Sequence, residues 1–307
     1  MRRKEMEIID IHAHIYSRVS GITKGAPMTS MKWGKVKIGN EISQFLPPAF
    51  EDTNSTPETL IAYMDWCGIS KALLMPNPYY GYHNDYFLEA IKKYPDRFRG
   101  VALVDLLRGE KAAQELEEIY KKTDLFGFKV ETDSTFQCAP YKHLAMKEFY
   151  PVWDCCNQYR QPVFLHLFTD QDVEDLKILI SEFPQILYVI CHMGADSCFA
   201  SGRKFENYET ILNLVKKHSN VYLDTSTVPV YFDEEYPFPS STKIIEQAYQ
   251  TVGADKMMWS SDYPGMLNHA TMNELINLVM RHCRIPQEDL EKIMGGNAKR
   301  LFFEGER

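Results

Sequence analysis

The strongest constraint on the fold is a pattern of eight short apolar runs, each separated from the next by a segment with helical periodicity. The runs are typical of buried strands and lie at 7–16, 71–77, 98–105, 125–132, 161–168, 185–194, 220–227 and 256–264. Connectors such as 109–122 and 171–183 carry apolar residues three or four positions apart, as one face of a helix does. Eight strand–helix units in 307 residues predict an α/β fold, a (β/α)8 TIM barrel.

An open, doubly wound sheet is the main alternative to this barrel. In that fold a glycine-rich, phosphate-binding turn often follows the first strand. The residues after the first apolar run contain no such turn. The sequence therefore favours the barrel, and we expect a single domain over residues 1–307.

The connection after the first strand is unusually long. Residues 17–57 are too rich in Gly, Pro, Ser and Thr to form one long helix. In a barrel this segment starts at the C-terminal end of the strands, where active sites lie, and long loops there often cover the site. We predict a long, lid-like loop insertion at 17–57. A helix should follow from Thr56, with Pro57 in its first turn and Gly68 at its end.

The first apolar run, EIIDIHAHIY, carries polar residues at every second position. Asp10, His12 and His14 should therefore share one face of the strand. The opposite face should carry Ile9, Ile11, Ala13 and Ile15. Two imidazoles that converge in this way can bind a metal ion, although a solvated strand edge would give the same pattern.

Three later strands also end in a polar residue. His166 ends the fifth strand, His192 the sixth and Asp262 the eighth. Because the C-terminal ends of all barrel strands surround one pocket, we expect these residues to meet His12 and His14. A single buried His or Asp usually satisfies a local hydrogen bond. Four imidazoles and a carboxylate together would leave several polar groups without partners, unless a divalent cation binds there.

Composition and charge exclude other classes of function. The net charge of −8 argues against a nucleic-acid-binding surface. The seven cysteines form no CxxC pair and are expected to be reduced. No membrane-spanning run is present, and the N-terminus lacks the apolar core of a secretory signal. We expect a cytoplasmic protein with a small-molecule substrate and no nucleic-acid or membrane partner; assembly into a homo-oligomer is left open.

Six motifs occur in order along nearly the whole chain: DIHAHIY, FGFKV, VFLHL, VICHMG, WSSDYP and IMGGNAKRLF. As an ordered set they resemble the amidohydrolase-2 (amidohydrolase-related) family of the metal-dependent amidohydrolase superfamily. The resemblance implies that His12, His14, His166 and Asp262 bind one divalent metal ion. It also implies that His192 lies beside the metal and contacts the substrate or the catalytic water. This set of nitrogen and oxygen ligands suits Zn²⁺, the expected ion, and also Mn²⁺.

The resemblance also draws attention to Lys129 on the fourth strand. Relatives in the wider superfamily carry a lysine there whose carbamate bridges two metal ions. In this chain Lys129 could instead bind an acidic substrate or pair with Glu131. We expect a mononuclear site and assign Lys129 to substrate binding.

Other candidate substrate contacts lie on the loops at the predicted mouth of the barrel. Trp33 belongs to the insertion, and Tyr82, His83 and Asn84 follow the second strand, whereas Arg203 follows the sixth. Exposed Tyr and Arg residues are common on loops, so position alone does not assign them a function.

The leading functional hypothesis is a metal-dependent hydrolase of a small ester, lactone or amide that uses a metal-activated water. Asp262 would take the proton of the water, while the metal and His192 polarise the carbonyl group. Asp10 would accept a hydrogen bond that fixes a histidine tautomer. The resemblance supports a second hypothesis, non-oxidative decarboxylation of a small aromatic or unsaturated carboxylic acid, with Asp262 delivering a proton to carbon. A metal-free binding protein is disfavoured because no predicted ligand is missing.

Overall fold

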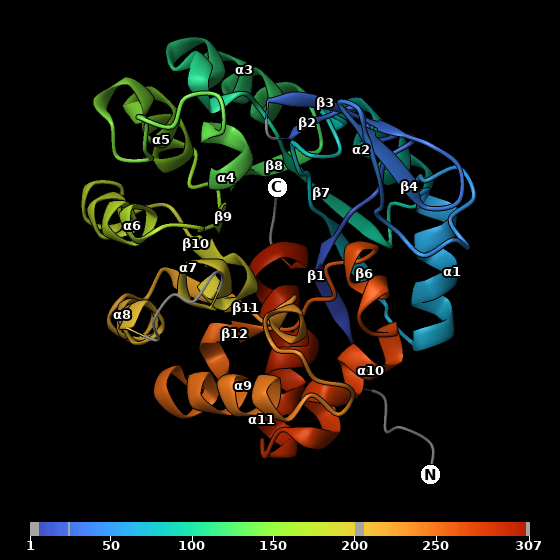
Figure 1. The fold of residues 1–307 in the computed structure, drawn as a ribbon. Helices are drawn as coiled ribbons and strands as arrows, with labels where there is room; N and C mark the ends of the chain where they lie inside the picture. The colour runs from blue at the N-terminus through green and yellow to red at the C-terminus, as the bar shows by residue number, and fades with distance from the viewer. Residues whose placement is uncertain (1–5, 24, 200–205, 305–307) are drawn as a thin grey trace.

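The eight predicted strands form one parallel sheet that curls into a barrel (Figure 1). The computed structural model describes residues 6–23, 25–199 and 206–304. Neighbouring strands follow the order of the chain, as in a (β/α)8 barrel, so the predicted fold is confirmed. The strands are β1 (Ile9–Ala13), β6 (Lys71–Leu74), β7 (Phe98–Ala102), β8 (Leu125–Glu131), β9 (Val163–His166), β10 (Tyr188–Ile190), β11 (Val221–Asp224) and β12 (Met257–Met258).

The barrel closes between β1 and the segment that follows β12. Ala13 and Tyr263 form a parallel bridge. The backbone N–H of Asp262 donates to the carbonyl of His12 at 2.8 Å, and that of His14 donates to the carbonyl of Tyr263 at 2.7 Å. Backbone hydrogen bonds therefore hold His12, His14 and Asp262 next to one another across the closure.

Helices surround the barrel (Figure 1). Thr56 caps α1 by accepting a hydrogen bond from the backbone N–H of Thr59, and Gly68 ends it at φ 78°, as predicted. None of the helices in the described ranges has the length and apolar character needed to cross a bilayer. The α-helices are α1 (Pro57–Cys67), α2 (Asn84–Lys93), α3 (Glu110–Lys122), α4 (Thr132–Phe136), α5 (Tyr150–Gln158), α6 (Asp170–Glu182), α7 (Ala195–Phe199), α8 (Glu206–Lys217), α9 (Pro239–Val252), α10 (Met272–Asn277) and α11 (Gln287–Glu291).

The insertion after β1 contains regular structure that the sequence analysis did not predict. Its antiparallel sheet consists of β2 (Ile22–Thr23), β3 (Ala26–Ser30), β4 (Lys35–Ile38) and β5 (Glu41–Gln44). These strands are short and mostly exposed, so they lack a clear apolar alternation.

The insertion lies at the C-terminal end of the barrel strands. The Ser20 N–H donates to the Tyr80 carbonyl at 2.8 Å, and the Asn268 side-chain amide donates to the Phe45 carbonyl at 2.7 Å. Tyr80 follows β6 and Asn268 follows β12, so the insertion contacts loops at the mouth. Its function as a lid stays a prediction.

An apolar layer fills the interior of the barrel toward the N-terminal end of its strands. It includes Ile9 and Ile11 of β1, Phe126 of β8 and Phe164 of β9, with Phe302 from the C-terminal segment. This packed layer leaves only the upper, C-terminal end of the strands for polar side chains.

Two strands change the direction of their side chains between the apolar layer and the mouth. In β1 the pairing register shifts between Asp10 and Ala13, so Ile9 and Ile11 join the inner layer while Ala13 and Ile15 pack in the outer core. The predicted common face for these four residues is therefore wrong, because a bulge interrupts the alternation. The predicted common face of Asp10 with His12 and His14 is wrong for the same reason.

In β8 the change coincides with a glycine. Gly127 has φ 62°, a conformation that glycine adopts without steric cost. Phe126 belongs to the inner layer, and three residues later the side chain of Lys129 contacts Cys191 and Glu131 in the interior. The irregularity therefore brings Lys129 and Glu131 to the same side as Phe126.

Candidate metal centre and active site

Three of the predicted metal ligands meet at the mouth of the barrel. Asp262 Oδ1 lies 3.0 Å from His14 Nε2 and 3.9 Å from His12 Nε2. One ligand atom from each residue lies within 4.8 Å of the other two. Both histidines are buried, whereas the Asp262 side chain is 19% exposed, so the cluster opens on the side of the carboxylate.

The other ring nitrogen of each histidine already has an acceptor. His12 Nδ1 lies 2.8 Å from Asp224 Oδ2, and His14 Nδ1 lies 2.6 Å from the Met75 carbonyl. A carbonyl and an ionised carboxylate only accept hydrogen bonds, so both Nδ1 atoms carry the proton. In the neutral rings the lone pairs are therefore on Nε2 and face the Asp262 carboxylate.

Lone pairs that face a carboxylate repel it unless a positive charge lies between them. His12 Nε2 is buried and has no hydrogen-bond partner. Burial lowers the pKa of His12, which keeps this ring neutral and its lone pair available. Two imidazole nitrogens and a carboxylate oxygen fit a divalent cation, and the exposed side leaves room for further ligands.

Asp262 is ionised in this arrangement. Burial alone would raise the pKa of its carboxyl group, but the hydrogen bond with His14 and the nearby rings of His192 and His12 hold that pKa well below its usual range. An ionised carboxylate is the form that binds a metal ion.

Three further site residues, which the sequence analysis missed, lie at or just after the end of β11: Asp224, Ser226 and Thr227. One oxygen of Asp224 contacts His12 Nδ1, and the other accepts a hydrogen bond from the backbone N–H of His192 at 2.9 Å. Ser226 and Thr227 hydroxyls both lie beside His192 Nδ1. Asp224 ends an apolar strand and precedes three hydroxyl residues, the same kind of signal that identified Asp262.

His166, the fourth predicted ligand, lies in a separate cluster. Its Nδ1 contacts Glu131 and its Nε2 contacts Asp196, which also accepts from the Tyr231 hydroxyl. The His166 ring centroid is 4.1 Å from that of His192. The structure thus places His166 beside His192, with a hydrogen bond from Nε2 to Asp196 and a close contact between Nδ1 and Glu131 that lacks hydrogen-bond geometry.

The two carboxylates make His166 a cation. Burial would lower the pKa of His166, but Glu131 and Asp196 raise it to about 9. Burial would likewise raise the pKa of Glu131, yet His166 and Lys129 bring it down to about 2.

The sequence analysis missed Asp196 and treated Glu131 only as a partner of Lys129. Asp196 lies beyond the end of β10, where no strand pattern marks it.

Lys129 is fully buried beneath the site. Its Nζ lies 3.2 Å from Cys191 Sγ and 3.6 Å from Glu131 Oε2. Burial would lower the pKa of Lys129, but Cys191 and Glu131 raise it, so the side chain is an ammonium. A carbamate forms on a neutral amine, so this environment opposes one. The pairing with Glu131 is the alternative that the sequence left open.

Four of the predicted substrate contacts belong to the insertion and to the segment after β6. Trp33 and Tyr82 are 55% and 58% exposed. His83 Nε2 bonds the Tyr80 carbonyl, and the Asn84 side chain makes two hydrogen bonds to the Leu103 backbone, at 2.8 and 3.0 Å. Within the described ranges no hydrogen bond joins these four residues to the three clustered ligands, so their role in binding stays a prediction. Arg203 lies outside the described residues.

Asp10 has a different partner from the one expected. It accepts from the backbone N–H groups of His12 and Ser261, both at 3.0 Å, and from the Ser261 hydroxyl. Burial raises the pKa of Asp10 to about 7. It therefore fixes the residue before Asp262, whereas Asp224 fixes the ring of His12.

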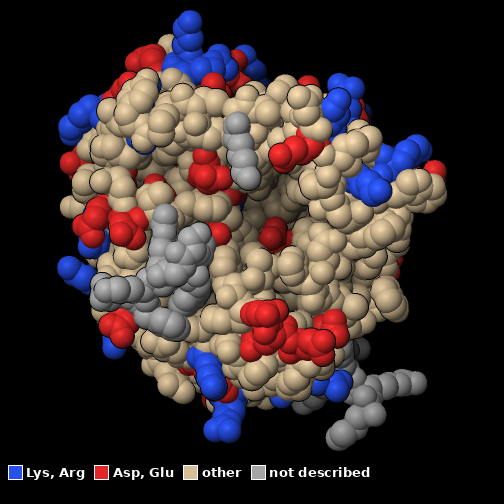
Figure 2. Space-filling view, in the orientation of Figure 1, with Lys and Arg blue, Asp and Glu red and all other residues tan. Residues whose placement is uncertain are grey.

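The surface over the barrel is acidic at its centre. On the face shown in Figure 2, a central hollow contains acidic side chains, and the Lys and Arg side chains lie toward the outer edge. Among the described residues, no Lys or Arg forms an ion pair with Asp196 or Asp262. This arrangement is unfavourable for a substrate that carries several negative charges.

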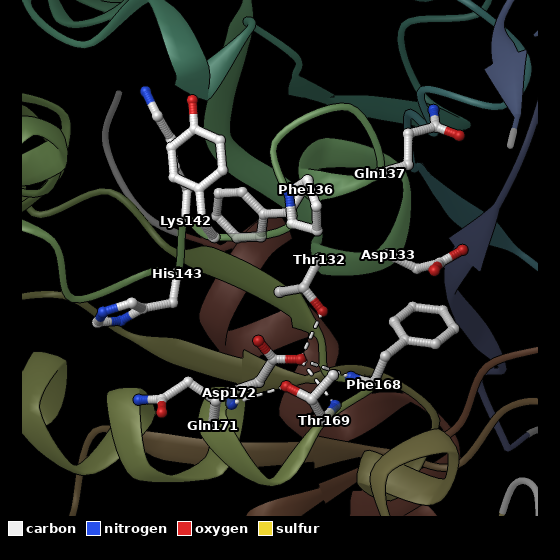
Figure 3. A pocket seen from close by; sticks show the side chains of 12 residues that line it. Thr132, Asp133, Phe136, Gln137, Lys142, His143, Phe168, Thr169, Gln171 and Asp172 are labelled. Atoms are coloured by element: carbon white, nitrogen blue, oxygen red, sulfur yellow. Dashed lines mark hydrogen bonds between the residues drawn. The ribbon is translucent and has the colours of Figure 1, made fainter. Parts of the chain in front are cut away.

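A cavity of about 470 Å³ lies between the loops that follow β8 and β9 (Figure 3). Asp172 joins these loops by accepting from the Thr132 hydroxyl at 2.8 Å and from the N–H groups of Phe168 and Thr169 at 2.9 and 2.8 Å. The Phe168 ring packs against His166 at 4.2 Å. These bonds fix the wall that covers His166, and none of the predicted metal ligands lines the cavity.

Comparison with known proteins identifies similar sequences and structures. The sequence model of the family described as Amidohydrolase matches residues 9–303. The gamma-resorcylate decarboxylase of a Polaromonas species is 24% identical over 260 residues, which are 71% of this chain and 74% of that protein. A probable 2-pyrone-4,6-dicarboxylic acid hydrolase from Acinetobacter baumannii has a TM-score of 0.70 at 21% identity, over 97% of this chain and 100% of that one. A zinc-bound amidohydrolase from Burkholderia multivorans has a TM-score of 0.71 at 16% identity, over 96% and 98%.

Proposed function

Because this chain belongs to the amidohydrolase family, we propose that it is a metal-dependent enzyme that hydrolyses a small, uncharged ester, lactone or amide. One observation carries the proposal: the Nε2 lone pairs of His12 and His14 face the carboxylate of Asp262. We propose that these three residues hold one divalent ion, Zn²⁺ first and Mn²⁺ as the alternative. Coordination by His166 would require it to leave Glu131 or Asp196, and remains a prediction.

The chain's own residues provide binding and proton transfer. A bound divalent ion polarises a carbonyl oxygen and lowers the pKa of water to about 7. Asp262 Oδ1 faces the histidines, while Oδ2 accepts from the Thr227 hydroxyl at 2.8 Å, so the carboxylate is fixed at both ends. Asp262 and His192 lie at the metal cluster and can take up the proton that the attacking water releases.

The acidic surroundings support an uncharged substrate. Glu131, Asp196 and Asp262 are ionised, and among the described residues the positive side chains beside them are His166 and Lys129, which are already paired. A substrate carboxylate would have the metal ion as its main cationic partner.

Decarboxylation of a small aromatic or unsaturated carboxylic acid is the second candidate. It is favoured by the similarity to the gamma-resorcylate decarboxylase. The residues that would hold the metal would thereby place it for the single carboxylate, and Asp262 would pass a proton taken from water to the carbon as its bond to the departing carbon dioxide breaks.

We propose a small molecule as the partner, because the net charge of −8 does not suit a nucleic-acid surface. The composition of the chain supports action in the cytoplasm. Assembly into a homo-oligomer would depend on protein concentration, so the activity assays should be run at a defined concentration.

The two candidates release different products. The parent protein, loaded with Zn²⁺ or Mn²⁺, should be tested on neutral lactones, esters and amides by acid release and on hydroxybenzoic acids by carbon dioxide release. Hydrolysis of a neutral substrate that is lost in Asp262→Asn would support the first candidate. Carbon dioxide release without hydrolysis would replace it with the second, and activity that survives complete metal removal would contradict both.

A further inference from the structure

Two hydroxyl groups converge on one nitrogen of His192. Ser226 Oγ lies 2.7 Å and Thr227 Oγ1 lies 2.8 Å from His192 Nδ1. All three residues are buried. The contacts leave the direction of the hydrogen bonds to be determined, because a hydroxyl can donate or accept and Nδ1 can do either.

The proton of each hydroxyl is already used elsewhere. Ser226 donates to Asp224 Oδ1 at 2.5 Å, and Thr227 donates to Asp262 Oδ2 at 2.8 Å. Asp224 Oδ1 also accepts from the backbone N–H groups of His192 and Ser226, at 2.9 and 3.1 Å, and Asp262 Oδ1 lies 3.0 Å from His14 Nε2. Both carboxylates are therefore placed as acceptors, and an ionised carboxylate only accepts. A hydroxyl has one proton, and neither Ser226 nor Thr227 can therefore donate to His192. The Nδ1 atom must be the donor.

We propose that Ser226 and Thr227 are positioning residues that fix His192 as the Nδ1–H tautomer, with Nε2 as a proton acceptor toward the site. Among the described residues His192 Nε2 has no hydrogen-bond partner, and it is not sealed from solvent. Burial, followed by the neighbouring His166 and His12, lowers the pKa of His192 to about 3, which agrees with a neutral ring.

This tautomer changes the role expected for His192. Polarising a carbonyl group requires an N–H at Nε2, which the network does not provide. A lone pair at Nε2 instead accepts a proton or a hydrogen bond from water. The assignment of the proton acceptor in catalysis rests on the proposed function, whereas the tautomer itself does not.

The backbone supports a specific role for this segment. Thr227 has φ 66°, His192 has φ 54° and Asp262 has φ 55°. Non-glycine residues seldom adopt this left-handed region, and a β-branched residue such as Thr is an outlier there. Three residues of one hydrogen-bonded network share this conformation, which indicates that their side-chain contacts are maintained against a backbone cost.

The tautomer can be measured directly in protein labelled with ¹⁵N-histidine. The chain has 9 histidines, and the His192 signals are those that disappear in His192→Asn. In the metal-free parent protein we expect Nδ1 to resonate in the range of protonated ring nitrogens and Nε2 in the range of unprotonated ones. The reverse assignment, or a doubly protonated ring at neutral pH, would overturn the proposal whether or not the protein is an enzyme.

Two variants test the hydroxyl groups. In Ser226→Ala/Thr227→Val the Nδ1 proton loses both acceptors, and we expect a mixture of tautomers; the unchanged parent tautomer would contradict the proposal. In the active protein, Thr227→Val should lower kcat about 10- to 100-fold with little change in KM, and Thr227→Ser, which keeps the hydroxyl, should restore it. If no substrate is turned over or no metal binds, the proposed function fails, but the spectra still decide the tautomer.

Discussion

Two histidine clusters lie side by side at the mouth of the barrel, and they balance their charges in opposite ways. In the first cluster, one carboxylate, Asp262, faces the lone pairs of His12 and His14. In the second, one ring, His166, lies between the carboxylates of Glu131 and Asp196. The ring of His192 separates them, with its centroid 4.7 Å from that of His12 and 4.1 Å from that of His166.

From this difference we propose that residue type alone does not identify a metal ligand. The second cluster neutralises one of its charges with a proton on His166, whose pKa is raised to about 9. The first cluster has both Nδ1 protons committed to Asp224 and Met75, so a cation from outside suits it. We propose that the surroundings of each ring, rather than its place at a strand end, distinguish the two roles.

Breaking the first cluster should have the largest effect. Asp262→Asn keeps the shape and one oxygen ligand but removes the charge and the basicity. We expect modest loss of metal and a fall in turnover of about 10²- to 10⁴-fold, as for lost general acid–base catalysis. Elemental analysis and steady-state kinetics check both. Asp255→Asn, at an exposed ion pair with Lys292, is the matched control and should change neither. Full metal content with more than half of the parent rate would remove Asp262 from the mechanism.

Breaking the second cluster should affect folding rather than metal binding. Glu131→Gln removes the carboxylate that pairs with Lys129 and leaves His166 with Asp196 alone, and loss of one partner of a buried ion pair costs about 3–5 kcal/mol. The free energy of unfolding in urea should fall by that amount, while the metal content of the folded protein stays at the parent level. Metal loss without a loss of stability would show that Glu131 is a metal ligand and that both clusters belong to one metal site.

The second cluster should also make stability depend on pH. The pKa of His166 is raised from 6.5 to about 9 in the folded protein, so its contribution is complete below about pH 6.5 and is lost as the pH rises through about 9. In metal-free protein the free energy of unfolding should fall between pH 7 and 9 by up to about 1.4 kcal/mol per pH unit.

Among the other perturbed groups of the site, the pKa values of His12, His192 and Glu131 are lowered, whereas that of Asp10 is raised to about 7 and titrates at the lower edge of this window. Asp10 therefore adds to the slope below about pH 8. His166→Asn should remove most of the slope between about pH 8 and 9, and a flat profile there in the metal-free parent would contradict the assignment. If the slope is present without metal and disappears with metal, His166 is a ligand after all.

The smallest effect is expected at the insertion. The Phe45 ring lies 5.7 Å from the Tyr80 ring, which lies 4.9 Å from His14 and links the insertion to the first cluster. Phe45→Ala should raise KM by less than about tenfold, or about 1.4 kcal/mol, with little change in stability. Ile42→Ala, on the exposed strand β5, is the control and should have no effect. Unchanged kinetics in Phe45→Ala would argue against a lid.

The sequence predicted the barrel and the first cluster because both depend on strand periodicity. His14 and Asp262 lie at the ends of apolar runs, and parallel strands bring such ends together. The separate environment of His166 could not be predicted in the same way. Glu131 reaches it only through the irregularity at Gly127, and Asp196 belongs to α7. Irregular backbone and residues beyond a strand carry no periodic signal.

The central claim, that the first cluster holds a divalent ion, is tested most directly by elemental analysis of the parent protein purified without chelator. We predict one equivalent of Zn²⁺ or Mn²⁺ per chain, which a chelator removes and either ion restores. Less than about a tenth of an equivalent, unchanged after incubation with Zn²⁺ or Mn²⁺, would contradict the account. The lone pairs of His12 and His14 would then face Asp262 for a reason other than metal binding.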